Sequence, residues 1–185
     1  MADLILSEAN ERMEKAVTHA RTEMSGVRSG RAAPQLVEKM SVEAYGVEMT
    51  IQQMASIAVP EARQLMITPH DPSNLEAIEK AIRNSDLGLS PSNDGRALRL
   101  NFPQLTAERR QELVKIVKGM TEDGKIAIRN IRREARKELE SAEKDKELTA
   151  DELARAEKDL DRLTQVSESF VDEVLATKEQ ELLEV

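Results

Sequence analysis

Apolar residues recur three and four positions apart along both ends of the chain, in residues 1–33 and again from residue 104 onward. Side chains at these spacings share one face of a helix, so the pattern predicts long amphipathic helices. One helix occupies the first flank, a second begins near the cap residue Thr106, and a third begins at Thr149. Thr149 and Glu152 have the spacing of a capping box. Three helices with one apolar face each can bury those faces only against one another, which predicts a three-helix bundle.

The buried face of each helix follows from the same spacing. The expected core positions are Leu6, Ala9, Met13, Val17, Ala20, Met24 and Val27, then Leu113, Val117, Met120, Ala127, Ile131, Ala135 and Leu139, then Leu153, Ala156, Leu160, Leu163, Val166, Phe170, Val174 and Leu182. Two glycines, Gly119 and Gly124, interrupt the second face, and each costs about 1 kcal/mol relative to alanine inside a helix. Two outcomes stay open: a break in the helix, or a close approach of another helix at Gly124.

The middle of the chain has a different pattern, because all six prolines fall between Pro34 and Pro103 and exclude a long helix there. The short runs SVEAYG, MASIAV, RQLMITP, LGLSP and ALRLNF are bounded by Gly, Pro, Asn and Asp, which predicts strands. The segment PSNLEAIEKAIRNS predicts one helix with Leu75, Ile78 and Ile82 on its apolar face. Residues 93–95, Asn-Asp-Gly, suit a tight hairpin turn.

These elements predict an α+β fold, a long three-helix bundle with an inserted small β/α/β domain. We expect residues 1–30 and 105–185 to form the bundle and residues 31–104 to form the inserted domain. The chain joins the two parts twice, near residues 27–34 and 102–105. We expect hinges there, at Gly30, Pro34, Phe102 and Pro103. Two connections permit hinge motion but restrict twisting more than one would.

Composition excludes several kinds of function. There is no cysteine, so neither a disulfide nor a thiolate metal site is expected. The two histidines, His19 and His70, fall in different expected domains, and neither has partners spaced for a catalytic triad. No phosphate-binding P-loop or GxGxxG motif occurs, so we expect no enzyme, cofactor or metal. No apolar run approaches a membrane span and no signal peptide is recognisable, which favours a cytoplasmic protein.

Charge is strongly segregated along the chain. The sequence contains 27 Lys and Arg against 35 Asp and Glu, a net charge of -8. Residues 109–137 carry ten basic and four acidic side chains, whereas residues 138–185 carry six and sixteen. The second helix is therefore basic along most of its length, and the third helix is acidic.

The basic side chains of the second helix form one stripe, which we call the basic stripe. At about 100° per residue, its seven members fall within an arc of about 100° on the side away from the apolar face. They are Lys115, Lys118, Lys125, Arg129, Arg132, Arg133 and Arg136. A solvated face held by surface ion pairs is one interpretation. We favour an anion-binding stripe, because few acids lie within the stripe and its face is expected to point away from the third helix. Structured RNA fits best, since its phosphates accept forked arginine contacts.

A smaller basic pair, Arg28 and Arg31, occurs in GVRSGRAAP. From local sequence alone, ordinary linker charges and phosphate contacts are equally good interpretations of this pair. Aromatic residues are scarce, with one Tyr, two Phe and no Trp, which argues against RNA binding by base stacking.

Several blocks together resemble the bacterial ribosome recycling factor family: VRSGRAAP, AYG, IEKAIRNSDLGLSPSNDG, FPQLTAERRQELVKIVKG and IAIRNIRREA. The resemblance covers essentially the whole chain, in order. It implies an L-shaped molecule with a flexible hinge that binds the post-termination ribosome. With elongation factor G and GTP, such a factor promotes subunit dissociation and release of messenger and transfer RNA. The implied partners are large-subunit ribosomal RNA and elongation factor G, with no membrane and no DNA, and the protein is expected to be a monomer off the ribosome.

The resemblance also assigns candidate RNA contacts. Arg129, Arg132 and Arg133 match the family's RNIRR motif, and Arg132 is the first candidate. Arg28 and Arg31 match the family's motif near the hinge, and Arg110 is a weaker match in ERR. Three further residues are included on charge and helix geometry only: Lys118, Lys125 and Arg136.

The chain departs from the family pattern at three positions, with Ser29 for Thr, Ala44 for Tyr and Glu134 for Asp. Ser29 and Glu134 keep the chemistry, whereas Ala44 is expected to remove a surface aromatic. Two other functions are weighed against recycling. One is an adaptor that binds proteins through acids of the third helix such as Asp159 and Asp161, and the other is an enzyme.

Overall fold

The structure is a computed structural model that describes residues 1–184. The chain divides into two compact units, one formed by residues 1–28 with the chain from Thr106 onward and the other by Ser29–Leu105. The α+β class is confirmed, because the first unit is all helical and the second contains both small sheets.

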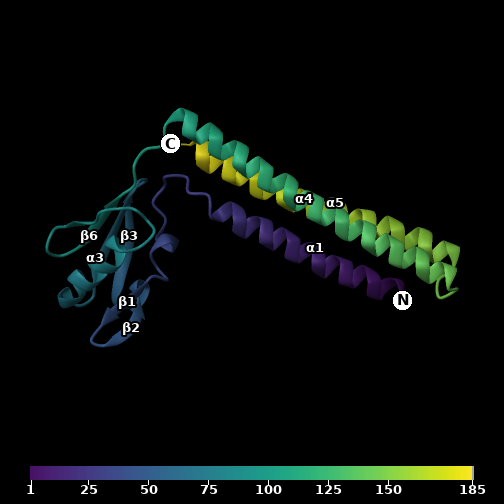
Figure 1. Ribbon diagram of the computed structural model, residues 1–185, viewed down its shortest axis with the longest axis horizontal. Coiled ribbons are helices and arrows are strands. Elements are labelled where there is room, and N and C mark those ends of the chain that lie inside the picture. The colour runs from purple at the N-terminus through teal and green to yellow at the C-terminus, as the bar shows by residue number, and fades with distance from the viewer. Residues whose placement is uncertain (185) are drawn as a thin grey trace. The chain divides into compact units, whose positions relative to one another are not determined.

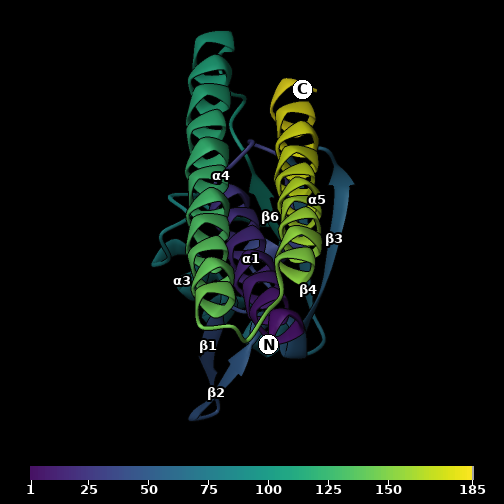
Figure 2. The same cartoon turned by 90° about the vertical axis from the view of Figure 1, so that its right-hand side faces the viewer.

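The first unit is a bundle of three long helices, α1 (Ala2–Ser25), α4 (Ala107–Lys144) and α5 (Ala150–Leu183). Each helix contacts the other two, and the three run side by side (Figures 1 and 2). Its most deeply buried side chains come from all three helices and include Met13, Met24, Val117, Ile128, Leu139, Leu160, Val171 and Leu182. The three-helix bundle expected from the sequence is therefore confirmed.

The helix starts expected from the sequence are confirmed as well. The Thr106 hydroxyl accepts a hydrogen bond from the Arg109 amide at 3.2 Å. Thr149 and Glu152 form the capping box, in which the Thr149 amide donates to the Glu152 carboxylate at 2.8 Å and the Glu152 amide donates to the Thr149 hydroxyl at 3.3 Å. These bonds satisfy backbone donors that a helix start otherwise leaves unpaired.

The second helix does not break at its glycines, since α4 runs without interruption through both of them. A Cβ at Gly124 would lie 3.2 Å from the Ala20 Cβ of α1 and 3.7 Å from Val171 of α5. At Gly119 a Cβ would meet none of residues 1–184 within 4 Å. Gly124 is therefore the point of close helix approach, and Gly119 makes no comparable contact.

The expected core of α5 was wrong over its middle. Val166 and Phe170 are each 47% exposed, whereas Thr164, Ser167 and Val171 are buried. The buried face accepts polar residues because their hydrogen bonds can be satisfied locally, as where the Thr164 hydroxyl donates to the Leu160 carbonyl at 2.8 Å. A similar displacement of one residue occurs elsewhere in the bundle. Ile5, Thr121 and Ile128 are buried, where Leu6, Met120 and Ala127 were expected and are only half-buried.

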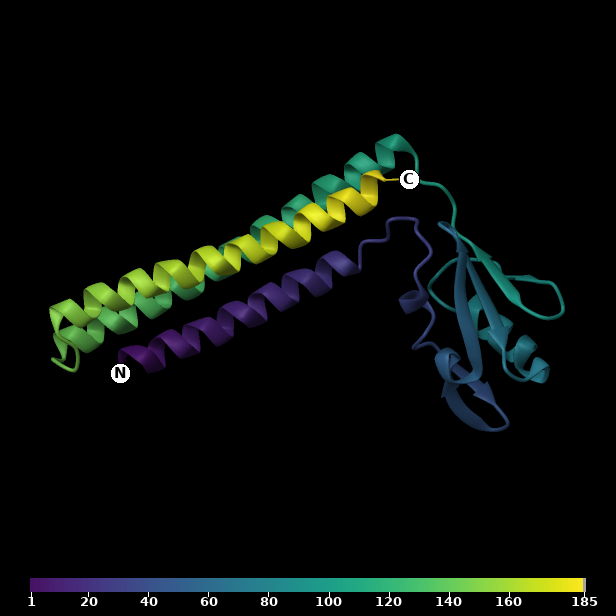
Figure 3. The ribbon, with the colours of Figure 1, turned by 180° about the vertical axis from the view of Figure 1, so that it is seen from behind.

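The second unit is built on a four-stranded antiparallel sheet in the order β3-β4-β6-β5. Its strands are β3 (Ala55–Glu61), β4 (Gln64–Pro69), β5 (Ser92–Asn93) and β6 (Leu98–Asn101). A separate hairpin pairs β1 (Ser41–Ala44) with β2 (Val47–Thr50). Three short helical segments are η1 (Pro34–Leu36), α2 (Ile51–Met54) and η2 (Pro72–Asn74). Helix α3 (Leu75–Arg83) lies against the sheet (Figure 3).

The core of this unit joins α3 to the sheet. Leu75, Ile78 and Ile82 are buried together with Ile67 of β4 and Leu100 of β6, which confirms the expected apolar face of α3. A hairpin is present here, but its turn begins later and is longer than expected, because Asn93 belongs to β5 and pairs with Leu98 of β6, which leaves residues 94–97 as the turn. The turn amides of Arg96 and Ala97 donate to the Asp94 carboxylate, which lowers the pKa of Asp94.

The strands differ from the expectation in two ways. LGLSP forms no strand, since Leu87 and Leu89 pack against the core without joining the ladder. Strand β2 was not expected, because VEMT contains no continuous apolar run, and its first two residues, Val47 and Glu48, are exposed in the structure.

The expectation about Ala44 was also wrong. Ala44 is 6% exposed within the core, and the surface aromatic of this hairpin is its neighbour Tyr45, 75% exposed. The Tyr45 hydroxyl lies 2.7 Å from the Asp71 carboxylate and 2.7 Å from the Ser73 hydroxyl. This network ties the β1–β2 hairpin to the turn before α3. Ala44 therefore leaves the surface aromatic of the hairpin in place.

Candidate nucleic-acid interface

All seven members of the basic stripe lie on the single continuous helix α4. Because α4 is unbroken, each residue from Lys115 to Arg136 rises about 1.5 Å along the helix axis, so the stripe is roughly 32 Å long. The stripe therefore keeps the spacing that the sequence predicts. Its electrostatic surroundings, however, differ from the prediction.

The stripe does not point away from α5. Five of its members pair with carboxylates of α5: Lys118 with Glu179 at 3.1 Å, Lys125 with Asp172 at 2.7 Å, Arg129 with Glu168 at 2.8 Å, Arg132 with Asp161 at 3.8 Å, and Arg136 with Glu157 at 2.9 Å. We call these contacts the acidic ladder. Position on a single helix does not exclude them, because long lysine and arginine side chains can extend sideways to a neighbouring helix.

The ladder follows from the antiparallel packing of α4 and α5. From Lys118 to Lys125 the chain of α4 advances seven residues, while the partners recede seven residues on α5, from Glu179 to Asp172. The next pair, Arg129 with Glu168, lies four residues later on α4 and four residues earlier on α5. Spacings of seven and four place charges along the edge of a helix–helix seam, as the flanking positions of a coiled coil do.

The ladder holds its cations unequally. Arg129 donates to Glu168 and, at 3.2 Å, to Glu122, and the hydrogen bond to Glu168 is the main cause of its raised pKa. Arg132 approaches Asp161 no closer than 3.8 Å, an ion pair that is too long for a hydrogen bond. Arg133 donates at 2.6 Å to the neutral side chain of Asn130.

Two stripe members pair with no carboxylate of the described chain. Within residues 1–184, no carboxylate lies within ion-pair distance of Arg133 or Lys115. Their charge is therefore not balanced by a contacting acid. Exposed ion pairs contribute about 0–1 kcal/mol each, so even the paired cations can exchange a carboxylate for a phosphate at small cost.

The remaining candidate arginines lie outside the stripe. Arg110 is half-buried in the first turn of α4. Arg28 is exposed just beyond the end of α1, and Arg31 is exposed at the start of the second unit. The stripe therefore collects the RNIRR arginines with the geometric candidates, and it does not include these three.

The expected hinge residues occur where the second unit begins and ends. Gly30 has φ +77°, and a Cβ there would lie 3.3 Å from the Leu105 side chain and 3.4 Å from the Pro103 carbonyl oxygen. Close by, both connections are fixed to the β3–β4 turn. The Ala32 amide donates to the Ala62 carbonyl at 2.9 Å, and the Phe102 amide donates to the Arg63 carbonyl at 2.8 Å. Pro34 begins η1. Pro34 and Phe102 thus form part of the folded body of this unit.

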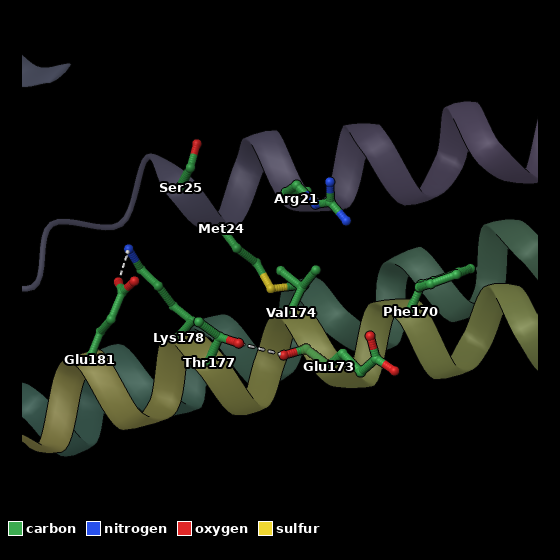
Figure 4. Close-up of a pocket in the computed structure, with 9 residues that line it drawn as sticks. All are labelled: Arg21, Met24, Ser25, Phe170, Glu173, Val174, Thr177, Lys178 and Glu181. Carbon is green, nitrogen blue, oxygen red and sulfur yellow. Dashed lines mark hydrogen bonds and ion pairs between the residues drawn. The ribbon is translucent and has the colours of Figure 1, made fainter.

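A groove of about 360 Å³ lies between α1 and α5 (Figure 4). Met24, Val174 and the exposed ring of Phe170 supply apolar surface, and Lys178 pairs with Glu181 at 3.2 Å on its rim. No residue of α4 lines this groove. It is therefore distinct from the basic stripe.

Other chemistry is sparse in the described part of the chain. His19 lies in α1 and His70 in the second unit, so the two histidines do not share a site within either unit. Residues 1–184 contain no cluster of three potential metal ligands. None of the helices described combines the length and apolar character needed to span a bilayer.

Comparison with known proteins identifies close relatives. The family described as "Ribosome recycling factor" matches residues 20–183. The ribosome-recycling factor of Corynebacterium glutamicum is 51% identical over 185 residues, that of Mycobacteroides abscessus 52%, and that of Bacillus licheniformis 48%, each alignment covering all of both chains.

Solved structures agree. A solution structure of a ribosome recycling factor matches with a TM-score of 0.81 at 38% identity, covering 100% of this chain and 98% of that one. A second match is the T. thermophilus factor, in models of this factor and E. coli elongation factor G bound to the E. coli post-termination complex. It has a TM-score of 0.66 at 41% identity and covers 99% of each chain.

Proposed function

The chain belongs to the ribosome recycling factor family, and on that premise we propose that it binds the post-termination ribosome. With elongation factor G and GTP, it promotes dissociation of the subunits and release of messenger RNA and transfer RNA. The observation that carries this proposal is the full-length match to a recycling factor placed with elongation factor G on a post-termination complex. The three-helix bundle and the separate unit that contains the sheets support the same conclusion.

The basic stripe is the proposed contact with large-subunit ribosomal RNA. Arg132 and Arg133 are its main anchors, because one has only a distant carboxylate and the other has none within the described chain. Arg129, Arg136, Lys118 and Lys125 contribute charge that the acidic ladder partly balances. Arg28, Arg31 and Arg110 are secondary contacts, supported by their match to family motifs rather than by a place on the stripe.

The proposed hinges lie at the two connections between the units. The amides of Ala32 and Phe102 are bonded to the β3–β4 turn, which supports bending outside these residues. We therefore assign the motion to residues 28–31 and 103–106, with Gly30 and Pro103 inside those ranges. Pro34 and Phe102 then act as the fixed ends against which bending occurs.

The protein itself catalyses no reaction in this proposal, and the GTP is hydrolysed by elongation factor G. It needs no cofactor, acts in the cytoplasm where the ribosomes are, and is a monomer when it is off the ribosome. Phosphate recognition by arginine requires only charge and geometry, which the stripe supplies without a reactive group.

The proposed RNA contact is tested by binding to purified large subunits. Arg132→Ala should weaken binding by roughly ten- to 150-fold, because a charged hydrogen bond contributes roughly 1.5–3 kcal/mol. It should also reduce the slope of log affinity against log salt by nearly one, since one phosphate contact is lost. Arg162→Ala is the matched control, because Arg162 lies on α5 and pairs there with Asp159 at 3.7 Å. Equal affinity of Arg132→Ala and Arg162→Ala would remove Arg132 from the interface.

A further inference from the structure

The carboxylates of the acidic ladder occupy the guanidinium and ammonium donors that a phosphate would otherwise use. They come from one side of α5, at spacings of four and seven residues, so each meets the stripe at a different level. As exposed ion pairs they add little to stability. Their position across a nucleic-acid face gives them a second effect, since a carboxylate beside a phosphate repels it.

Glu168 is the least exposed carboxylate of this ladder. Its side chain is 25% exposed, the lowest value among the five carboxylates, and it accepts the Arg129 Nε–H at 2.8 Å. Glu122 holds another nitrogen of the same guanidinium at 3.2 Å. Arg129 is thus bound between two carboxylates, whereas Arg133 is bound to none in the described chain.

We propose that the α5 carboxylates, above all Glu168, are specificity-determining residues that suppress binding of the stripe to RNA of arbitrary shape. This inference rests on the proposed function, because it assigns a role to the acids that flank the proposed RNA contacts. A generic duplex approaches many parts of the stripe and meets the carboxylates along most of its length. The cognate surface gains most of its contacts at Arg132 and Arg133, where carboxylates are distant or absent among the described residues. Discrimination thus comes from repulsion of the wrong partner as much as from attraction of the right one.

The test compares Glu168→Gln with Glu173→Gln, which removes the same charge from the same helix. Glu173 lines the groove between α1 and α5 and makes no ion pair with α4 among the described contacts. The probes are a short random-sequence RNA duplex and purified large ribosomal subunits, each measured over a range of salt concentrations. Circular dichroism shows whether the helices of each variant are retained.

We expect Glu168→Gln to bind the random duplex about two- to fivefold more tightly, the scale of one released surface ion pair. Its affinity for large subunits should change by less than its affinity for the duplex. The ratio of subunit affinity to duplex affinity should therefore fall. Glu173→Gln should leave that ratio unchanged. In a protein that already carries Arg129→Gln, adding Glu168→Gln should give a smaller gain in duplex affinity, because the cation that Glu168 pairs with is missing.

Three results would overturn the inference. They are an unchanged duplex affinity in Glu168→Gln, an equal gain in Glu173→Gln, and a full gain that persists without Arg129. The second result would mean that bulk charge alone controls binding. If the unaltered protein fails to bind large subunits at all, the proposed function fails instead, so the two failures are distinguishable.

Discussion

The close approach of three helices at Gly124 makes a quantitative prediction for Gly124→Ala. The new Cβ would lie 3.2 Å from the Ala20 Cβ, closer than the optimum of about 3.5–4.0 Å between carbon atoms. The Ala20 Cβ is attached directly to the backbone of α1, so it cannot rotate away and α1 itself must move. Such overpacking costs about 1–3 kcal/mol, whereas alanine gains about 1 kcal/mol over glycine in helix propensity. The net expectation is a loss of about 0–2 kcal/mol.

Gly119→Ala is the matched control on the same helix. A Cβ at Gly119 meets nothing within 4 Å, so only the propensity term applies and the variant should gain about 1 kcal/mol. The difference between the two variants should be about 1–3 kcal/mol, which is the packing cost alone because the propensity terms cancel. Urea unfolding followed by helical circular dichroism measures both free energies of unfolding.

A second variant tests the cause of that difference. Adding Ala20→Gly to Gly124→Ala moves the small residue to the other helix and should restore the packing, visible as a favourable coupling between the two sites. If Gly124→Ala instead stabilises the protein as much as Gly119→Ala, α1 does not approach α4 at this level. The packing described for the bundle core would then be wrong there.

Three other changes have defined expectations. Thr149→Ala should cost about 1 kcal/mol by removing one half of the capping box, measured by urea unfolding, and Thr149→Ser should recover most of it. Tyr45→Phe should raise the pKa of Asp71, measured by NMR titration, because the Tyr45 hydroxyl is the main group that lowers it. The stability that comes from the lowered pKa is present above the unfolded-state pKa and is lost as pH falls through the folded-state pKa. The variant should therefore be less stable than the unaltered protein at neutral pH, and the difference between the two should shrink in acid. Gly30→Ala should destabilise the second unit by about 1–2 kcal/mol, because an L-residue is strained at φ +77°; unchanged unfolding would contradict that strain.

Local signals made the helical bundle predictable. A cap such as Thr106 or the pair Thr149 and Glu152 acts through neighbouring backbone amides, so it can be recognised from adjacent residues alone. The close approach at Gly124 was one of two outcomes left open, because a glycine on an apolar helix face permits either a break in the helix or the contact of a neighbouring helix. These features depend on a few residues each and need no knowledge of the tertiary structure.

The errors occurred where the outcome depends on a neighbour. Val166 and Phe170 were expected in the core because apolar spacing does not show that Thr164 can be buried with its hydroxyl bonded to its own helix. Strand β2 depends on pairing with β1, and its own residues carry little apolar signal.

The same limit applies to the candidate site. A single-helix projection gave the membership and length of the basic stripe, because both depend only on α4. It could not give the acidic ladder, since the pairing of Arg129 with Glu168 depends on the register of α5 against α4. The available signal was a set of acids seven and four residues apart on α5 and of cations seven, four and three residues apart on α4. Matching the two sets requires the helices to be aligned antiparallel.

The central claim is that this protein recycles ribosomes, and subunit splitting tests it most directly. Purified post-termination ribosomes are mixed with the protein, elongation factor G and GTP, and the products are separated by sedimentation. The proposal predicts that separate subunits accumulate only when all three are present, and that Arg132→Ala splits fewer ribosomes than Arg162→Ala at the same protein concentration. Intact ribosomes after incubation with the unaltered protein, elongation factor G and GTP would contradict it.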